Sequence, residues 1–568
     1  MIRVPAALAA PLATLVLVGA ATAWSAEPPG TGAPVPLRPP AAGAPADIVG
    51  GQTDYKPPPA IPSFESQELA APDPDGVGTL DVATGGVLPG TAWQGSTQPF
   101  VANLVASLPA GIASPTLRRL TRQLLLSAVA PPAAADGARQ WTARRLERVA
   151  SMGDAGAARE LAALAPFALE DEAAARAFVG SELLLGNADD VCRQVPPLVV
   201  RHKTADWQEF IVLCRRRAKE DAAAALALDI LRETEQEATF VRLADEATLG
   251  AKAPALKSLP DARPVEAAVV LEANRAFPAD AVTRATPPVL LAIVRSEPTA
   301  AAIRLAAAGR AARLGLIEAR DLGLLYRQAK VAADAKPGSP ESLAALYQAL
   351  MAAPDPVAKG DALRRAIDAA GAGDLGGTYG ELLSAELGIL APGPDQAALA
   401  PAAVKLLLVQ NRADLARPWI DLVQSNEAAS ALWPLIEASG ASSRPGGAAD
   451  WLAGLELERN PLRREQAGTA LAYLAAAKVA VDPAVRAATL STAPVAGSAA
   501  LPPVALFALL EEAGAARRQG ETALLAVLVL DGKAPAGLVG VSAVRQLAAA
   551  GLEMQARQLA VEAIADLR

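Results

Sequence analysis

Thiol and imidazole groups, which carry much of the nucleophilic and metal-binding chemistry of proteins, are scarce in this sequence. Cys192 and Cys214 are the only cysteines, and His202 is the only histidine. A structural zinc site takes four ligands, so these three groups would hold the metal only with the help of a carboxylate. We therefore expect no metal and no cofactor. His202 lies in a charged turn, Arg201-His202-Lys203, and we interpret it as a solvated loop residue.

The two cysteines are better placed to form a disulfide. Cys192 lies on the apolar side of one predicted helix, and Cys214 lies on the apolar stripe of the next. Both are nearly equidistant from the turn near His202, so antiparallel helices would bring them to a similar height. In an oxidising compartment this arrangement predicts a Cys192–Cys214 disulfide. Pro196 and Pro197 lack amide donors, and we expect them to kink or end the first helix.

Motifs of nucleotide-binding and hydrolytic enzymes are missing or lack their structural setting. Residues 371–376 (GAGDLG) match the dinucleotide string G-x-G-x-x-G, which requires a strand before it and a helix after it. Residues 362–370 have the periodicity of a helix instead, so we interpret the glycine-rich segment as a loop. Phosphate-loop, nucleophile-elbow and H-E-x-x-H patterns do not occur. With a single histidine available for proton transfer, we predict that the protein is not an enzyme.

The N-terminal part of the chain has the composition of a targeting segment followed by a spacer. Arg3 precedes an apolar stretch over residues 4–20, and Ala21-Thr22-Ala23 fits the pattern that signal peptidase prefers. We expect a signal peptide over residues 1–23; cleavage after Ala26 and retention as a membrane anchor are the alternatives. Residues 24–99 are rich in proline and glycine, which favours a disordered tether.

Helical periodicity starts near residue 100 and is most regular between residues 141 and 233. Three helix–turn–helix units align there by their turns, with Met152, Leu185 and Ala218 at intervals of 33 residues. A period near 34 with this layout resembles the tetratricopeptide-repeat class of α-solenoids. The resemblance implies stacked helical hairpins with a long shared surface, and we assign residues 100–250 to such repeats.

The remainder of the sequence predicts further helices with a less regular spacing. Breaks rich in proline and glycine near residues 251–263 and 391–394 separate a middle helical block, residues 251–394, from C-terminal helical repeats, residues 395–568. Alanine, leucine, glutamate and arginine, which favour helices, dominate, and aromatic residues reach only 4%. The predicted fold is all-α: irregular helical-hairpin repeats (an α-solenoid) after a signal peptide and a proline-rich tether.

The helical part is also similar in kind to the superhelix of periplasmic soluble lytic transglycosylases. In that family a lysozyme-like domain supplies a catalytic glutamate in a Glu-Ser pair. The pair Glu65-Ser66 lies in the predicted tether, and residues 551–555 (GLEMQ) echo the family's downstream motif without a catalytic pair before them. The chain thus departs from the family where its activity resides.

Composition favours a protein-binding surface over a nucleic-acid site. Charged residues make up 20% of the chain, the net charge is −8, and the two signs are interspersed without a basic stripe. No segment after the N-terminal apolar stretch is long and apolar enough to span a membrane. We expect a periplasmic or secreted protein of the bacterial envelope, with no nucleic-acid partner; the sequence does not specify its oligomeric state.

The predicted function is that of a non-catalytic scaffold or adaptor that binds a protein or peptide partner in the cell envelope. Arrays of helical repeats bind such partners through many modest contacts. The alternative is a cell-wall-associated protein that recognises or processes peptidoglycan. The basic run Arg215, Arg216 and Arg217 is the candidate binding surface, and a solvated helix end is its plainer interpretation.

Overall fold

The structure is a computed structural model that describes residues 73–80, 87–134, 140–204, 206–233, 238–331, 335–423, 426–441, 447–457, 459–490 and 501–567. The described residues all belong to one compact unit, Ala70–Arg568. The predicted signal peptide, residues 24–72 of the predicted tether and the pair Glu65-Ser66 lie outside the described residues.

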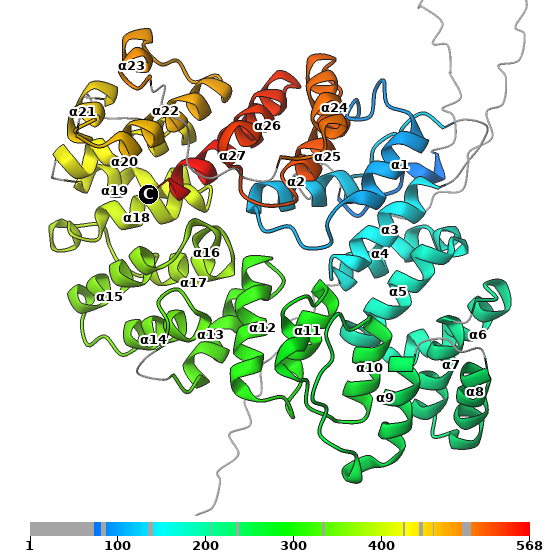
Figure 1. Ribbon diagram of the computed structural model, residues 1–568. Helices are drawn as coiled ribbons and strands as arrows, with labels where there is room; N and C mark the ends of the chain where they lie inside the picture. The colour runs from blue at the N-terminus through cyan, green and yellow to red at the C-terminus, as the bar shows by residue number, and fades with distance from the viewer. Residues whose placement is uncertain are drawn as a thin grey trace, which may run out of the picture. The chain divides into compact units, whose positions relative to one another are not determined.

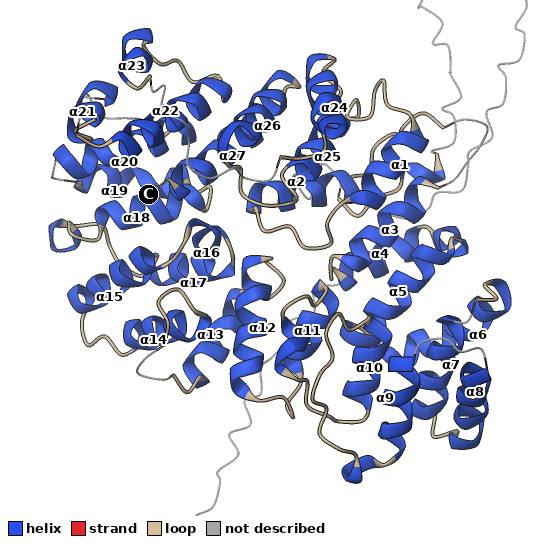
Figure 2. Cartoon of the chain, in the orientation of Figure 1, coloured by secondary structure: helices blue, strands red, loops and turns tan. Residues whose placement is uncertain are grey.

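Helices are the only regular secondary structure among the described residues, which confirms the predicted all-α class (Figure 2). Its described residues form no β-strand, and only two isolated bridges, Leu80 with Ser127 and Thr97 with Ala133, have strand-like pairing. None of the helices within the described ranges is long and apolar enough to cross a membrane. The helices are short and joined by short turns, as expected of helical hairpins.

Neighbouring helices pack in pairs along the chain (Figure 1). The N-terminal group comprises α1 (Gln98–Ser107), α2 (Pro115–Leu126), α3 (Trp141–Ser151), α4 (Ala155–Leu164), α5 (Glu172–Leu185), α6 (Ala188–Arg201), α7 (Asp206–Arg217), α8 (Asp221–Glu233) and α9 (Ala238–Thr248). The middle group comprises α10 (Pro264–Glu272), α11 (Pro287–Arg295), α12 (Ala301–Arg313), α13 (Ala319–Gln328), α14 (Pro340–Met351), α15 (Pro356–Ala369), α16 (Ala372–Gly376) and α17 (Thr378–Leu387).

The C-terminal group follows the same pattern of short helices. It comprises α18 (Ala400–Val409), α19 (Ala413–Leu422), α20 (Asn426–Ser439), α21 (Gly447–Gly454), α22 (Pro461–Ala476), α23 (Pro483–Ala488), α24 (Val504–Ala515), α25 (Gln519–Val529), α26 (Gly537–Ala549) and α27 (Glu553–Asp566). The segment 371–376 is wrongly predicted as a loop, because residues 372–376 form the one-turn helix α16. Helix α15 precedes it, as the periodicity of residues 362–370 indicates.

The three predicted repeat units correspond to the hairpins α3–α4, α5–α6 and α7–α8. Each hairpin contacts the next, through α3 with α5 and α6 with α7. The chain turns at Gly153 and Lys219 with φ angles of +82° and +61°, the left-handed conformation that ends a helix and reverses its direction. Asp154 then accepts a hydrogen bond from the amide of Ala157 at 3.1 Å and caps α4.

The last part of the predicted tether packs against these helices. Asp75 is buried and accepts hydrogen bonds from Gln98 Nε2 at 3.1 Å and from the amide of Thr142 at 3.2 Å. Trp93 is 3% exposed, and its ring lies 5.0 Å from that of Trp141 in an edge-to-face arrangement. The start of the helical array is therefore covered by residues 73–80 and 87–97. The buried side chains of Asp75 and Trp93 hold this segment in place, although it is rich in proline and glycine.

Helices from the two ends of the array are in contact. Helix α2 packs against α25 and α27. Glu562 on α27 is 3% exposed; it accepts hydrogen bonds from Ser114 Oγ at 2.6 Å and from the amide of Thr116 at 2.8 Å. A buried carboxylate thus caps the N-terminus of α2, where free amides and the helix dipole favour negative charge. Burial raises the pKa of Glu562, and the hydrogen bonds from Ser114 and Thr116 oppose that shift.

Candidate functional site

A disulfide joins α6 to α7 at the boundary between the second and third hairpins. Cys192 and Cys214 are bonded, with their Cα atoms 5.3 Å apart, so the predicted pairing is present. Of the two outcomes expected at Pro196 and Pro197, a kink or an end of the helix, the end is wrong, since α6 continues to Arg201. Proline within a helix is unfavourable by about 3 kcal/mol, so packing of α6 and the covalent link must offset that cost.

The two prolines change what α6 can offer to a ligand. Proline has no N–H group, so the carbonyls of Cys192 and Arg193 lack the intrahelical donors that positions 196 and 197 would normally supply. Both residues line a cleft beside the disulfide. Backbone carbonyls without helix partners are strong acceptors that favour a hydrogen bond from water or from a bound molecule.

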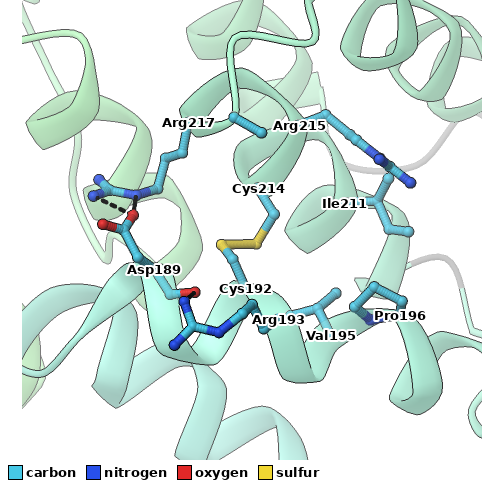
Figure 3. A pocket seen from close by; sticks show the side chains of 10 residues that line it. Asp189, Cys192, Arg193, Val195, Pro196, Ile211, Cys214, Arg215 and Arg217 are labelled. Atoms are coloured by element: carbon cyan, nitrogen blue, oxygen red, sulfur yellow. Dashed lines mark hydrogen bonds and ion pairs between the residues drawn. A yellow bond between two sulfur atoms is a disulfide. The ribbon is translucent and has the colours of Figure 1, made fainter.

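The cleft lies between α6 and α7 and has a volume of about 260 Å³ (Figure 3). Val195 and Ile211 form apolar parts of its wall together with the disulfide. Arg193 and Arg215 stand on different helices, and their side chains are 71% and 44% exposed. The site therefore combines apolar surface and guanidinium donors in a small space.

The predicted basic run does not act as one surface. Arg215 lines the cleft and forms an ion pair with Glu220. Arg216 extends away from it and donates a hydrogen bond to the carbonyl of Ala244 on α9 at 3.1 Å. Arg217 lines the cleft but is held by partners on both sides. Of the three predicted binding residues, the structure brings Arg215 and Arg217 to the cleft.

Arg217 connects three helices. Its Nε and Nη2 atoms donate to Asp189 of α6 at 3.0 and 2.9 Å, and Nη1 donates to Glu272 of α10 at 2.5 Å. Burial alone would lower the pKa of Arg217, but the hydrogen bond that it donates to Asp189 and the charge of Glu272 outweigh burial and raise it. A second hollow of about 410 Å³ lies on the other side of Arg217, with Leu213 and Leu271 in its wall. We interpret Arg217 as a structural tie between the two hollows.

His202 is not a solvated loop residue, so that interpretation was wrong. It is 9% exposed, and its ring stacks on Trp207 with the ring centroids 5.5 Å apart. Trp207 Nε1 donates to Glu172 at 3.2 Å, and the hydroxyl of Thr204 together with this indole N–H lowers the pKa of Glu172. The turn folds back because stacking on the indole buries more apolar surface than an exposed loop would. The histidine thus packs the joint between α6 and α7.

A buried acidic residue that was not singled out from the sequence lies elsewhere on α7. Glu209 is 2% exposed and accepts two hydrogen bonds from Arg263, at 3.0 Å from Nη1 and 2.8 Å from Nη2. Burial raises the pKa of Glu209 to about 7, against the opposing effect of Arg263. Its position in the apolar run Trp207–Cys214 is the sequence signal that could have identified it, because a carboxylate there must be buried and paired.

Neither a metal site among the described residues nor a likeness to known proteins adds to these residue roles. Within the described ranges, no group of three or more histidine, cysteine, aspartate or glutamate side chains is arranged to hold a metal ion. Comparison of the chain with protein-family models, with curated proteins and with solved structures finds no match.

Proposed function

We propose that this protein is a non-catalytic scaffold or adaptor that binds a protein or peptide partner on the surface of its helical repeats. The observation that carries the proposal is the cleft between α6 and α7, where Arg215 and apolar side chains flank a disulfide. Hairpins that resemble tetratricopeptide repeats must stack to bury their apolar faces, and stacking leaves extended surfaces for partners.

The cleft is small and adjoins a second hollow. Small-molecule sites usually enclose about 300–1,000 Å³, and this cleft has about 260 Å³. Such a space holds one or two side chains of a larger molecule. The neighbouring hollow beyond Arg217, about 410 Å³, lengthens the available surface across α5, α7 and α10. An extended ligand would use both hollows, whereas a compact ligand would use one.

We further propose that the protein acts in the periplasm or outside the cell. The predicted signal peptide over residues 1–23 is the main support. The Cys192–Cys214 disulfide is compatible with this location, because such bonds persist in oxidising compartments and are rare in the cytosol.

The alternative, recognition or processing of peptidoglycan, has one observation in its favour. Glu209, with a pKa of about 7, lines a hollow of about 280 Å³, and raised carboxyl pKa values are typical of general acids. The bidentate contact with Arg263 and an exposure of 2% argue for a structural role instead. The described residues also contain a Glu-Ser pair of the kind that carries the acid in lytic transglycosylases, Glu341-Ser342. This pair lies at the start of α14, where the amide of Ser342 donates to the capping Ser339, so it forms part of a helix end.

The experiment that tests the proposal is capture of partners from intact cells by crosslinking, with Arg215→Glu as the test variant. Arg364→Glu is the matched control, because Arg364 is 40% exposed and also pairs with one carboxylate, but lies on α15. We expect Arg215→Glu to lose a partner that the wild type and Arg364→Glu both capture, with melting temperatures of the two variants close together.

Two outcomes would contradict the proposal. Equal capture by the wild type and Arg215→Glu would show that the cleft does not contact the partner. Release of soluble fragments from peptidoglycan by the purified protein, abolished in Glu209→Gln, would establish the alternative instead.

A further inference from the structure

We propose that the cleft between α6 and α7 binds a peptide in an extended conformation, through its main-chain amides, an aliphatic side chain and an adjacent acidic side chain. This inference rests on the proposed function and specifies the chemistry of the partner. Three features of the site carry it: the backbone carbonyls before the two prolines, the apolar wall and the guanidinium of Arg215.

The carbonyls of Cys192 and Arg193 indicate an extended ligand. Both lack their usual helix donors because Pro196 and Pro197 have no N–H groups. The amides of a helical ligand are already bonded within the helix, whereas an extended segment has free N–H groups. Main-chain hydrogen bonds of this kind supply affinity in known modes of extended-peptide recognition.

The apolar wall next to these carbonyls selects an aliphatic side chain. Val195 and Pro196 on α6 face Ile211 on α7 across the cleft (Figure 3). The disulfide fixes the separation of the two helices, so the slot is formed before a ligand arrives. A preformed slot lowers the entropic cost of binding. Burying one leucine-sized side chain there raises the affinity of a short peptide by about tenfold to a hundredfold.

Arg215 favours a peptide with an acidic side chain next to the aliphatic one. Its side chain is 44% exposed, next to Ile211, and its only described ion pair is with Glu220, 46% exposed. Ion pairs this exposed contribute little to stability, so a ligand carboxylate can exchange with Glu220. Arg217 is less available, because Asp189 and Glu272 both hold it. We therefore assign Arg215 the recognition of charge and Arg217 the spacing of the helices.

The test uses fluorescent, end-capped hexapeptides with glutamate followed by isoleucine at the centre, among glycine and serine. Three matched probes replace the glutamate by glutamine, replace the isoleucine by serine, or methylate the central amide nitrogens. Binding of each probe to the full mature chain is measured by anisotropy. We expect each change to weaken binding to the wild type about fivefold or more. We also expect Arg215→Glu to lose at least tenfold in affinity for the glutamate probe, with Arg215→Lys in between and Arg364→Glu unchanged.

Equal affinity for the glutamate and glutamine probes, or for the methylated and unmethylated ones, would overturn the inference. So would binding that Arg215→Glu leaves intact. The outcomes separate this inference from the proposed function. If no probe binds but partner capture from cells still depends on Arg215, the peptide chemistry is wrong and the scaffold role stands.

Discussion

Removing the disulfide should weaken the joint between the second and third hairpins by an amount set by its loop. The bond closes a loop between residues 22 apart in the sequence, which in the chain-entropy account stabilises the fold by about 3 kcal/mol. The perturbation is the double variant Cys192→Ala, Cys214→Ala, which leaves no free thiol. Because the bond links only α6 and α7, we expect the loss to concentrate in these helices and their neighbours.

Hydrogen exchange of the amides in α6 and α7 is the appropriate assay, because a repeat array can open locally without unfolding as a whole. A loss of about 3 kcal/mol corresponds to opening that is roughly a hundredfold more frequent. Helix α18 serves as the internal control and should be unaffected. Reducing the wild type should reproduce the effect, and the double variant should not respond to the reductant. Unchanged protection of α6 and α7 in the double variant would refute the reasoning.

Two further predictions concern buried acids. Burial raises the pKa of Glu209 from 4.5 to about 7, so between these pH values the folded chain keeps a proton that the unfolded chain has lost. The free energy of unfolding of the wild type, relative to that of Glu209→Gln, should therefore fall by about 3 kcal/mol as the pH rises through this window. Urea unfolding measures both proteins, and parallel curves of stability against pH would exclude the raised pKa. Glu562→Ala removes the acceptor for Ser114 and Thr116 and should lower the free energy of unfolding by about 3 kcal/mol. The control Glu553→Ala changes an exposed site on the same helix and should leave the melting temperature nearly unchanged. Equal melting temperatures of the two variants would contradict the capping role of Glu562.

Features encoded by local periodicity were predictable from the sequence. The 33-residue spacing placed the turns of the three hairpins, and the structure turns at Gly153 and Lys219 as that spacing requires. The pairing of Cys192 with Cys214 followed from their equal distances to one turn, because antiparallel helices preserve such distances. The all-α class followed from composition and from the length of the periodic segments.

Contacts that depend on tertiary packing were not predictable in this way. The hydrogen bond between Ser114 and Glu562 joins residues 448 positions apart, and no local pattern marks either as a partner of the other. Sequence rules predicted that Pro196 and Pro197 kink or end the helix, but those rules omit the packing and the covalent link with which α6 continues to Arg201. The burial of His202 likewise depends on the stacking of its ring on the indole of Trp207. Only Arg215 and Arg217 of the predicted basic run reach the cleft, because Arg216 lies on another side of α7.

Site-specific photo-crosslinking in intact cells tests the central claim, binding of a partner at the cleft, most directly. A photoreactive amino acid at position 193 places the probe at the rim, where Arg193 is 71% exposed. Position 389 is the control, because Ile389 is 69% exposed but lies outside the cleft. We predict a discrete crosslinked partner from position 193 that is absent from position 389 and is lost when Arg215→Glu is added. The same products from both positions, or a crosslink at position 193 that survives Arg215→Glu, would contradict the account.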